Sequence, residues 1–269
     1  MKHFNEPAIL GRTGLKVGRL GISSSYGASA AAYEEAFERG CNYFVMGSFM
    51  KGRSKEMTEA IKNITNKGQR DQLVICMMEY THSGLIGKSH FYKGLKKLGL
   101  DHVDVFMLGY HPRKPRNRVM DLALHLKEKG AVNHLALSGH NRKLFPKLMD
   151  DQIIDIFQVR YNAANSGAEK DVFPYVGGTD RPGIISFTAT RWGQLLKESK
   201  MPSGEKPLTA KECYRFVLSN PAVDVCMTGA RTHKMMMENL ETLESGPLTP
   251  EEMERIRHIG DHVYGKPRS

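Results

Sequence analysis

The sequence predicts a (β/α)8 barrel, an α/β fold of eight parallel strands that alternate with helices, and three observations lead to this prediction. Short apolar runs of strand character alternate with helical stretches along nearly the whole chain. The length of 269 residues matches the roughly 250 residues that such a barrel needs. No linker rich in proline, glycine or serine interrupts the pattern, so we expect residues 1–269 to form one domain.

The chain opens with a segment typical of a β-hairpin. Residues 8–22 alternate apolar and polar side chains around glycines, and Arg12-Thr13-Gly14 offers a turn between the two arms. The second arm leads into the first of the eight expected strands. We expect these strands near residues 19–22, 42–45, 73–77, 104–108, 134–137, 153–159, 183–187 and 224–227.

Helices are predicted between these strands, and after the last one, from apolar spacing, capping residues and glycine stops. Gly40 ends the first helix, and Ser89 is the expected N-cap of the helix that Gly99 ends. The expected helices cover residues 28–39, 54–66, 91–98, 117–129, a stretch ending at 149, a short segment after 169, 209–219, 232–243 and 250–263.

Composition argues against several classes of protein. No apolar run approaches the roughly 18 residues of a membrane span, and the N-terminus lacks a signal-peptide apolar region, so we expect no membrane partner. The four cysteines are isolated, which predicts buried reduced thiols in a cytoplasmic protein, and no metal-ligand spacing is present. The net charge of +10 is scattered along helices without a basic tract interleaved with aromatic residues. This pattern favours a phosphate-bearing small ligand over a nucleic acid, and the sequence says nothing about a protein partner.

Six stretches resemble the aldo-keto reductase family, in the same order along the chain. Residues 10–21 (L-G-R-T-G-L-K-V-G-R-L-G) resemble the family's N-terminal hairpin, and residues 36–44 resemble its passage into the second strand. Residues 102–108 are similar to its fourth strand and residues 218–230 to its eighth strand. The segments 237–241 and 247–252 resemble its closing helices. The resemblance implies a (β/α)8 barrel with an N-terminal hairpin, C-terminal helices and NADP(H) at the C-terminal face of the barrel.

The residues that the family uses to hold its cofactor are largely kept. Ser138 and Gln158 stand where the resemblance implies contacts to the nicotinamide carboxamide, and Phe187 stands where an aromatic ring stacks on the nicotinamide. Gly139 and Met235 depart from the family's usual polar residues. The implied cofactor-binding residues are Ser138, Gln158, Phe187, Thr188, Arg191, Gly193, Gly229, Arg231, Thr232, Glu238 and Asn239. Each also has a plainer interpretation, as a satisfied buried polar group, a core side chain or a surface charge.

The catalytic tetrad of the family is missing. Family members use an aspartate, a tyrosine, a lysine and a histidine to protonate the alkoxide that forms when a carbonyl receives a hydride. The four matching positions hold Val45, Met50, Met78 and Gly109, which offer neither a proton nor a charge. A positioned general acid contributes roughly 10²–10⁴ in rate, so we expect ordinary carbonyl reduction to be slow or absent.

Two residues are candidates to replace the lost groups. If the third and fourth strands continue, Tyr80 points to the same side as Met78, and His111 to the same side as Gly109. The alternative is that both residues lie in loops and only line the rim.

Three functions therefore remain open at this point. The chain is an NADP(H)-binding oxidoreductase with a divergent site, an inactive relative that acts as a cofactor sensor or interaction module, or a barrel recruited to non-redox chemistry.

Overall fold

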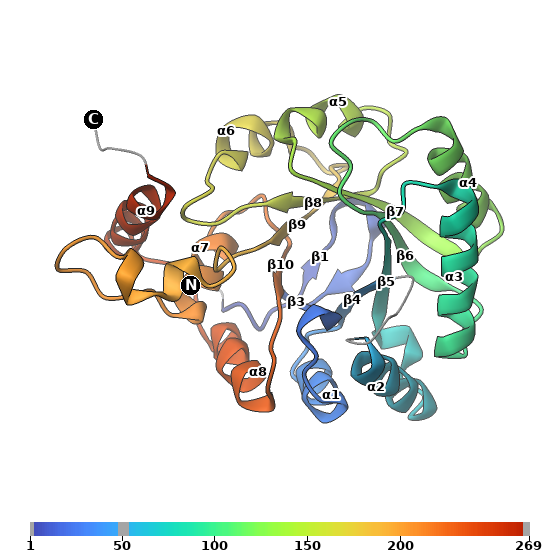
Figure 1. Ribbon diagram of the computed structural model, residues 1–269, viewed down its shortest axis with the longest axis horizontal. Coiled ribbons are helices and arrows are strands. Elements are labelled where there is room, and N and C mark those ends of the chain that lie inside the picture. The colour runs from blue at the N-terminus through green and yellow to red at the C-terminus, as the bar shows by residue number, and fades with distance from the viewer. Residues whose placement is uncertain (1–2, 48–53, 266–269) are drawn as a thin grey trace.

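The computed structural model describes residues 3–47 and 54–265, and these form a closed barrel of eight parallel strands. The strand order around the barrel is β10-β3-β4-β5-β6-β7-β8-β9, so each strand pairs with its neighbour in sequence and β10 closes the ring against β3. Figure 1 shows the strands in the centre and the helices around them. The predicted fold class is confirmed.

The eight strands lie where the sequence places them, with shifts of up to three residues at their ends. Their bounds are β3 Leu20–Ser23, β4 Tyr43–Gly47, β5 Val74–Glu79, β6 Val103–Leu108, β7 Val132–Gly139, β8 Ile156–Arg160, β9 Gly183–Phe187 and β10 Val225–Thr228. The register is continuous: Tyr43 pairs with Val74, Cys76 with Val105, and Ser138 with Gln158.

Alternation along the strands divides the apolar residues into two groups. Tyr43, Val45, Cys76 and Met78 belong to a cluster inside the barrel, and their neighbours in sequence pack outward against the helices. Both faces are apolar because a parallel barrel is covered on both sides, which explains the unbroken apolar run at Val74–Met78. The four cysteines are free and buried, as expected.

The N-terminal hairpin closes the bottom of the barrel. It consists of β1 (Ala8–Ile9) and β2 (Lys16–Val17), which are antiparallel. Leu10 and Val17 are fully buried in the same cluster as the inward strand residues. Asn42 fixes the hairpin, since its amide accepts from the Gly18 N–H and donates to the carbonyls of Lys16 and Gln72, at 2.9–3.0 Å.

Three aspartates stabilise the sheet at the N-terminal ends of alternate strands. Asp104 accepts from the backbone N–H of Ile75, Asp155 from Leu135 and Asp224 from Ile184, each at 2.8–2.9 Å. Each carboxylate also pairs with a cation, as in the two-pronged contact of Arg181 with Asp224. A carboxylate that accepts a hydrogen bond from a backbone N–H and also pairs with a cation is strongly held. All three lie at the end of the barrel opposite the site described below.

Nine helices are present in the described part of the chain. Their bounds are α1 Ala30–Glu38, α2 Lys55–Asn66, α3 Gly84–Leu98, α4 Asn117–Glu128, α5 Pro146–Met149, α6 Ala168–Asp171, α7 Ala210–Leu218, α8 His233–Leu240 and α9 Pro250–Tyr264. The prediction for α3 was wrong at its start. Ser83, whose side chain accepts from the Ile86 N–H, caps this helix, and Ser89 lies inside it.

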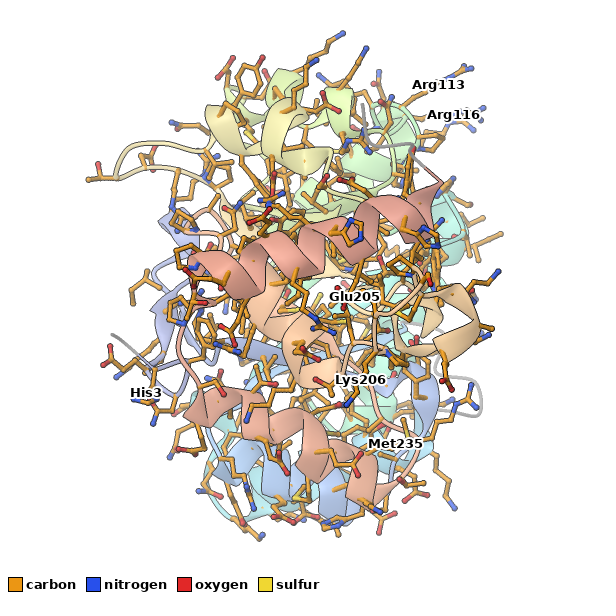
Figure 2. All side chains as sticks on the ribbon, turned by 90° about the vertical axis from the view of Figure 1, so that its left-hand side faces the viewer. His3, Arg113, Arg116, Glu205, Lys206 and Met235 are labelled. Atoms are coloured by element: carbon orange, nitrogen blue, oxygen red, sulfur yellow. The ribbon has the colours of Figure 1, made fainter. Side chains whose placement is uncertain are left out.

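Helix α9 holds the loop that precedes α7. Figure 2 shows α9 lying across one side of the molecule, with Glu205 and Lys206 beside it. Arg255 of α9 pairs with Glu205 at 3.0 Å and with Glu212 of α7 at 2.9 Å. Within residues 3–47 and 54–265, no helix combines the length and the apolar character needed to cross a membrane.

Candidate active site

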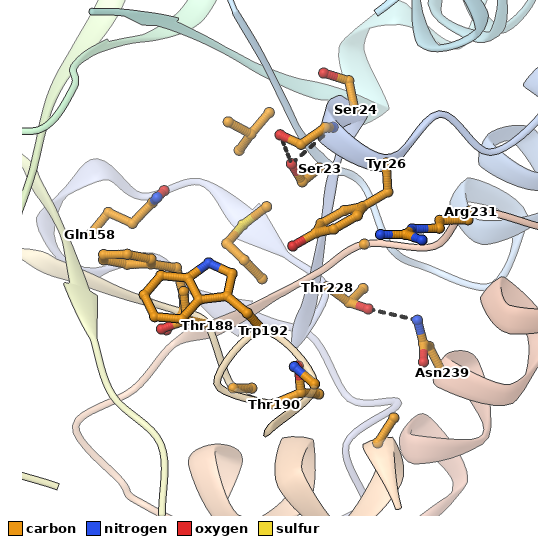
Figure 3. Close-up of a pocket in the computed structure, with 18 of the residues that line it drawn as sticks. Ser23, Ser24, Tyr26, Gln158, Thr188, Thr190, Trp192, Thr228, Arg231 and Asn239 are labelled. Carbon is orange, nitrogen blue, oxygen red and sulfur yellow. Dashed lines mark hydrogen bonds between the residues drawn. The ribbon is translucent and has the colours of Figure 1, made fainter. Parts of the chain in front are cut away.

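A cavity of about 540 Å³ opens at the C-terminal ends of the barrel strands. This is the end at which barrel enzymes carry their chemistry. Figure 3 shows Gln158 and Trp192 on one side of the cavity, and Tyr26 and Arg231 on the other. Its lining draws on both ends of the chain: Ser23, Ser24, Ser25, Tyr26, Val45, Met46, Gly47, Met78, Tyr80, Tyr110, Gln158, Phe187, Thr188, Ala189, Thr190, Trp192, Gly193, Leu196, Ala210, Tyr214, Met227, Thr228, Gly229, Arg231, Met235 and Asn239.

Two of the four tetrad positions form the floor of this cavity. Val45 of β4 and Met78 of β5 line it, and each side chain is almost fully buried. Met50 lies outside the described residues. Gly109, the fourth position, follows β6, and the ring of Tyr80 packs against it, so that a Cβ at 109 would lie 2.8 Å from Tyr80 Cδ1. Tyr80 thus fills space that a side chain at 109 would need.

Tyr80 and His111, the two candidates to replace the lost groups, lie in different surroundings in the structure. Tyr80 lines the cavity, but His111 is not among the lining residues. The condition for an inward His111 is not met, because β6 ends at Leu108 and Tyr110 adopts a positive φ of 55°, which breaks the alternation. Tyr110 therefore enters the cavity in its place, stacked on Tyr80 with ring centroids 5.4 Å apart. His111 lies 4.1 Å from the ring of His82 and is buried.

The titrating groups around the cavity are not tuned to act as acids near neutral pH. Burial raises the pKa of Tyr80, and the neighbouring Tyr110 raises it further. Burial also raises the pKa of Tyr110. Burial and the nearby His82 lower the pKa of His111 to about 4, so His111 is neutral at pH 7.

Ser138 and Gln158 form a pair of buried polar side chains on neighbouring strands. Their Cα atoms are register partners on β7 and β8. Ser138 Oγ and Gln158 Oε1 are both buried and have no hydrogen-bond partner within the described part of the chain. Gln158 lines the cavity and Ser138 does not. An unsatisfied buried polar group costs about 1–3 kcal/mol, so Gln158 Oε1 is suited to take a partner from a ligand in the cavity. Phe187, the next residue in the predicted set, lines the cavity beside Gln158.

The loop after β9 carries the predicted residues Thr188, Arg191 and Gly193. Thr188 and Gly193 line the cavity, and Arg191 does not. The guanidinium of Arg191 instead donates to the carbonyl of Val263 and lies over the ring of Tyr264, at the end of α9. Backbone strain gathers in this loop, since Thr188, Arg191 and Trp192 have positive φ values of 49–61°.

The predicted residues after β10 also divide into two groups. Gly229, Arg231 and Asn239 line the cavity, and the amide of Asn239 donates to Thr228 Oγ1 at 2.9 Å. Thr232 caps α8 by accepting from the Met235 N–H, and it lies outside the lining. Glu238 faces solvent on α8, 4.0 Å from Lys234.

The lining is positively charged. It contains Arg231 and no aspartate or glutamate among the described residues. Within the same residues, no group of three histidine, cysteine, aspartate or glutamate side chains is arranged to hold a metal ion. The described lining is therefore suited to an anionic or apolar ligand.

Comparisons with known proteins identify the family. A model of the aldo/keto reductase family matches residues 14–206, well over half of the chain. The chain belongs to the aldo/keto reductase family. No curated protein matches its sequence.

Solved structures of aldo-keto reductases share the fold. The holo form of aldo-keto reductase AKR11C1 from Bacillus halodurans superimposes with a TM-score of 0.74 at 17% identity, over 94% of this chain and 96% of that one. The thermostable aldo-keto reductase Tm1743, in complex with the inhibitor epalrestat, gives a TM-score of 0.74 at 19% identity, over 94% of this chain and 99% of that one. Membership of the aldo/keto reductase family implies an oxidoreductase, and members generally bind NAD(P)H.

Several lining residues of this aldo/keto reductase barrel are not in the predicted cofactor and tetrad sets. They include residues 23–26, at the end of β3 and in the turn after it, and the aromatic residues Tyr110 and Trp192. The serine and tyrosine cluster S-S-S-Y at the end of the first barrel strand is the available signal for the first group, because loops at that end of a strand face the site. Tyr110 and Trp192 carry no such signal, since each depends on a left-handed backbone conformation.

Proposed function

We propose that this protein is an NADP(H)-binding member of the aldo/keto reductase family with a divergent active site, in which ordinary carbonyl reduction is slow or absent. Gln158 Oε1 supports the proposal most strongly, because it is buried without a hydrogen-bond partner among the described residues and its residue lines the cavity. Ser138 lies outside the lining, but it is the register partner of Gln158 on β7 and its Oγ also has no partner among the described residues. A carboxamide offers both donors and an acceptor, so it suits a hydroxyl beside an amide oxygen. These two residues stand at the positions that the family uses for that group.

Other residues of the chain fit the rest of the cofactor. Phe187 presents an apolar ring at the cavity wall next to Gln158. Arg231 lines the cavity at its other side and has no hydrogen-bond or ion-pair partner among the described residues, which suits a phosphate. Bound NADPH would supply a hydride. Thr232, Glu238 and Arg191 lie outside the lining, so they would contribute only by contacts at the rim of the cavity.

The side chains that donate the proton in the family's usual reaction are replaced in this chain. Val45 and Met78 are apolar, Gly109 has no side chain, and the phenols of Tyr80 and Tyr110 have raised pKa values. A phenol with a raised pKa gives up its proton less readily to a developing alkoxide. We therefore expect rates about 10²–10⁴ below those of a complete tetrad.

A non-catalytic role as a cofactor sensor or interaction module is the second candidate. The apolar floor at Val45 and Met78 favours it, because binding alone needs no proton donor. Neither candidate requires a membrane or a nucleic acid.

Two measurements separate the candidates. Calorimetric titration with NADPH and NADH tests binding, and consumption of bound NADPH with a panel of aldehydes, ketones and quinones tests chemistry. Binding with slow consumption supports the divergent oxidoreductase, and binding with none supports the sensor. Absence of binding to either nucleotide refutes both and leaves non-redox chemistry.

A further inference from the structure

Arg160 is a cation at the mouth of the barrel that the proposed cofactor site does not use. It is the last residue of β8 and pairs in register with Phe187 of β9. Register partners on neighbouring parallel strands point to the same face of the sheet. Because Phe187 lines the cavity, Arg160 lies on the same face of the sheet, two residues beyond Gln158, although Arg160 is itself outside the set of lining residues.

The guanidinium of Arg160 has no partner in the described residues. Its Nε is buried without a hydrogen bond, and no hydrogen bond or ion pair joins its other nitrogens to the described chain. The carboxylates of the following segment are engaged elsewhere, since Glu169 binds Arg257 and Asp171 binds Arg142. A partly buried guanidinium offers five donors in a fixed plane, so it gains most from an acceptor that a ligand brings.

Aromatic rings surround the place where that ligand would lie. His140 is near enough for the charge of Arg160 to lower its pKa, after the larger effect of burial. The His140 ring lies 5.5 Å from Phe187 and stacks on Tyr110 at 5.3 Å. The ring of Tyr110 is 6.4 Å from Phe187. These three rings form an apolar wall, with Arg160 at the end of β8 beside it.

We infer that the mouth of the cavity binds a small planar molecule that carries a carboxylate, with Arg160 as its counter-ion and the rings of Tyr110, His140 and Phe187 against its apolar part. A single guanidinium matches a planar carboxylate through two parallel hydrogen bonds. A phosphate dianion is normally held by more donors, and no lysine lies in the described lining. The inference names the ligand class of the proposed active site, but the site itself does not require bound NADP(H).

Benzoylformate is a suitable probe because it joins a carboxylate to a carbonyl and a phenyl ring. Its methyl ester is the matched control, with nearly the same shape and no charge. Calorimetric titration of the purified protein without nucleotide measures both. We expect benzoylformate to bind about 10- to 100-fold more tightly than the ester, the range that a hydrogen-bonded charge contributes.

Two arginine variants identify the residue responsible. Arg160→Met removes the charge and keeps an unbranched side chain, so it should abolish the preference for benzoylformate while the thermal melt stays unchanged or rises. Arg231→Met removes the arginine that lines the cavity and should keep the preference. Equal binding of acid and ester by the wild type, or an unchanged preference in Arg160→Met, overturns the inference.

Phenyl phosphate tests the carboxylate assignment. Tighter binding of phenyl phosphate than of benzoylformate would show that the site takes phosphates, and absence of any binding would refute a ligand site at Arg160. NADPH titration of the same samples separates these outcomes from failure of the proposed function. A protein that binds NADPH but not benzoylformate contradicts only the inference about Arg160.

Discussion

Replacement of Gln158 by leucine should change stability and cofactor binding in opposite directions. In the free protein, Gln158 Oε1 is buried with no hydrogen-bond partner among the described residues, and leucine keeps most of the side-chain volume while removing that oxygen. Relief of one unsatisfied polar group is worth about 1–3 kcal/mol, less the cost of imperfect packing, so we expect an increase of about 1 kcal/mol in the free energy of unfolding.

The same substitution removes a proposed partner of the nicotinamide carboxamide. Leaving a ligand amide without its partner costs about 1–3 kcal/mol, which is about a 5- to 150-fold increase in the Kd for NADPH. Urea unfolding measures the first effect, and titration of nicotinamide fluorescence measures the second. Gln152→Leu is the control, because Gln152 is exposed before β8 and pairs with Asp180. A Gln158→Leu protein that binds NADPH as the wild type does would refute the assignment of the carboxamide site.

Three further perturbations test other parts of the structure. Gly109→His should lower stability by about 1–3 kcal/mol because its Cβ meets the ring of Tyr80, and adding Tyr80→Ala should restore it in urea unfolding. The pKa of His111 in the folded protein is about 4, below its ordinary value, so the unfolded chain takes up a proton first as the pH falls. The free energy of unfolding should therefore fall between about pH 6.5 and pH 4, by up to about 3 kcal/mol. A His111→Gln variant should lose that dependence in thermal melts measured over this pH range. Asn42→Ala should cost about 2–3 kcal/mol by leaving the Gly18 N–H and two carbonyls unpaired, and a smaller loss in urea unfolding would contradict the account of the hairpin.

The barrel is predictable from the sequence because its strands and helices carry local signals. Gly183–Phe187 is an apolar run bounded by turn residues, and the structure gives β9 the same bounds. The helices at 210–218 and 250–264 begin with capping boxes, at Thr209 with Glu212 and at Thr249 with Glu252. Ser83 and Ser89 are equally good caps by residue type. The hydrogen bond from the Ile86 N–H to Ser83 Oγ shows which one starts α3.

The candidate site is less predictable, because backbone conformation beyond the strand ends decides which side chains enter the cavity. Tyr80 follows strand alternation and lines the cavity, but the positive φ of Tyr110 brings that ring inward and leaves His111 outside. Arg191 is drawn to the end of α9 by a carbonyl that lies 72 residues later in the chain. No local pattern reports such a contact.

Arg160 shows the complementary case. Its place on the same face of the sheet as Gln158 follows from its position two residues later, but its lack of a partner depends on pairings made elsewhere, by Glu169 with Arg257 and by Asp171 with Arg142. The direction of a strand side chain can be predicted from the sequence, but the ion pairs between distant residues cannot.

We propose that the barrel keeps its nicotinamide site and has lost its proton donor. A single-turnover experiment tests cofactor binding and proton donation together. Protein in excess over NADPH is mixed with a reactive aromatic aldehyde while the emission of the bound nicotinamide is followed, excited directly or through Trp192 at the cavity. We predict a bound-state emission that persists or decays slowly after mixing. Decay at the rates typical of enzymes, roughly 1–10³ per second, or the absence of any bound-state emission, would contradict the account.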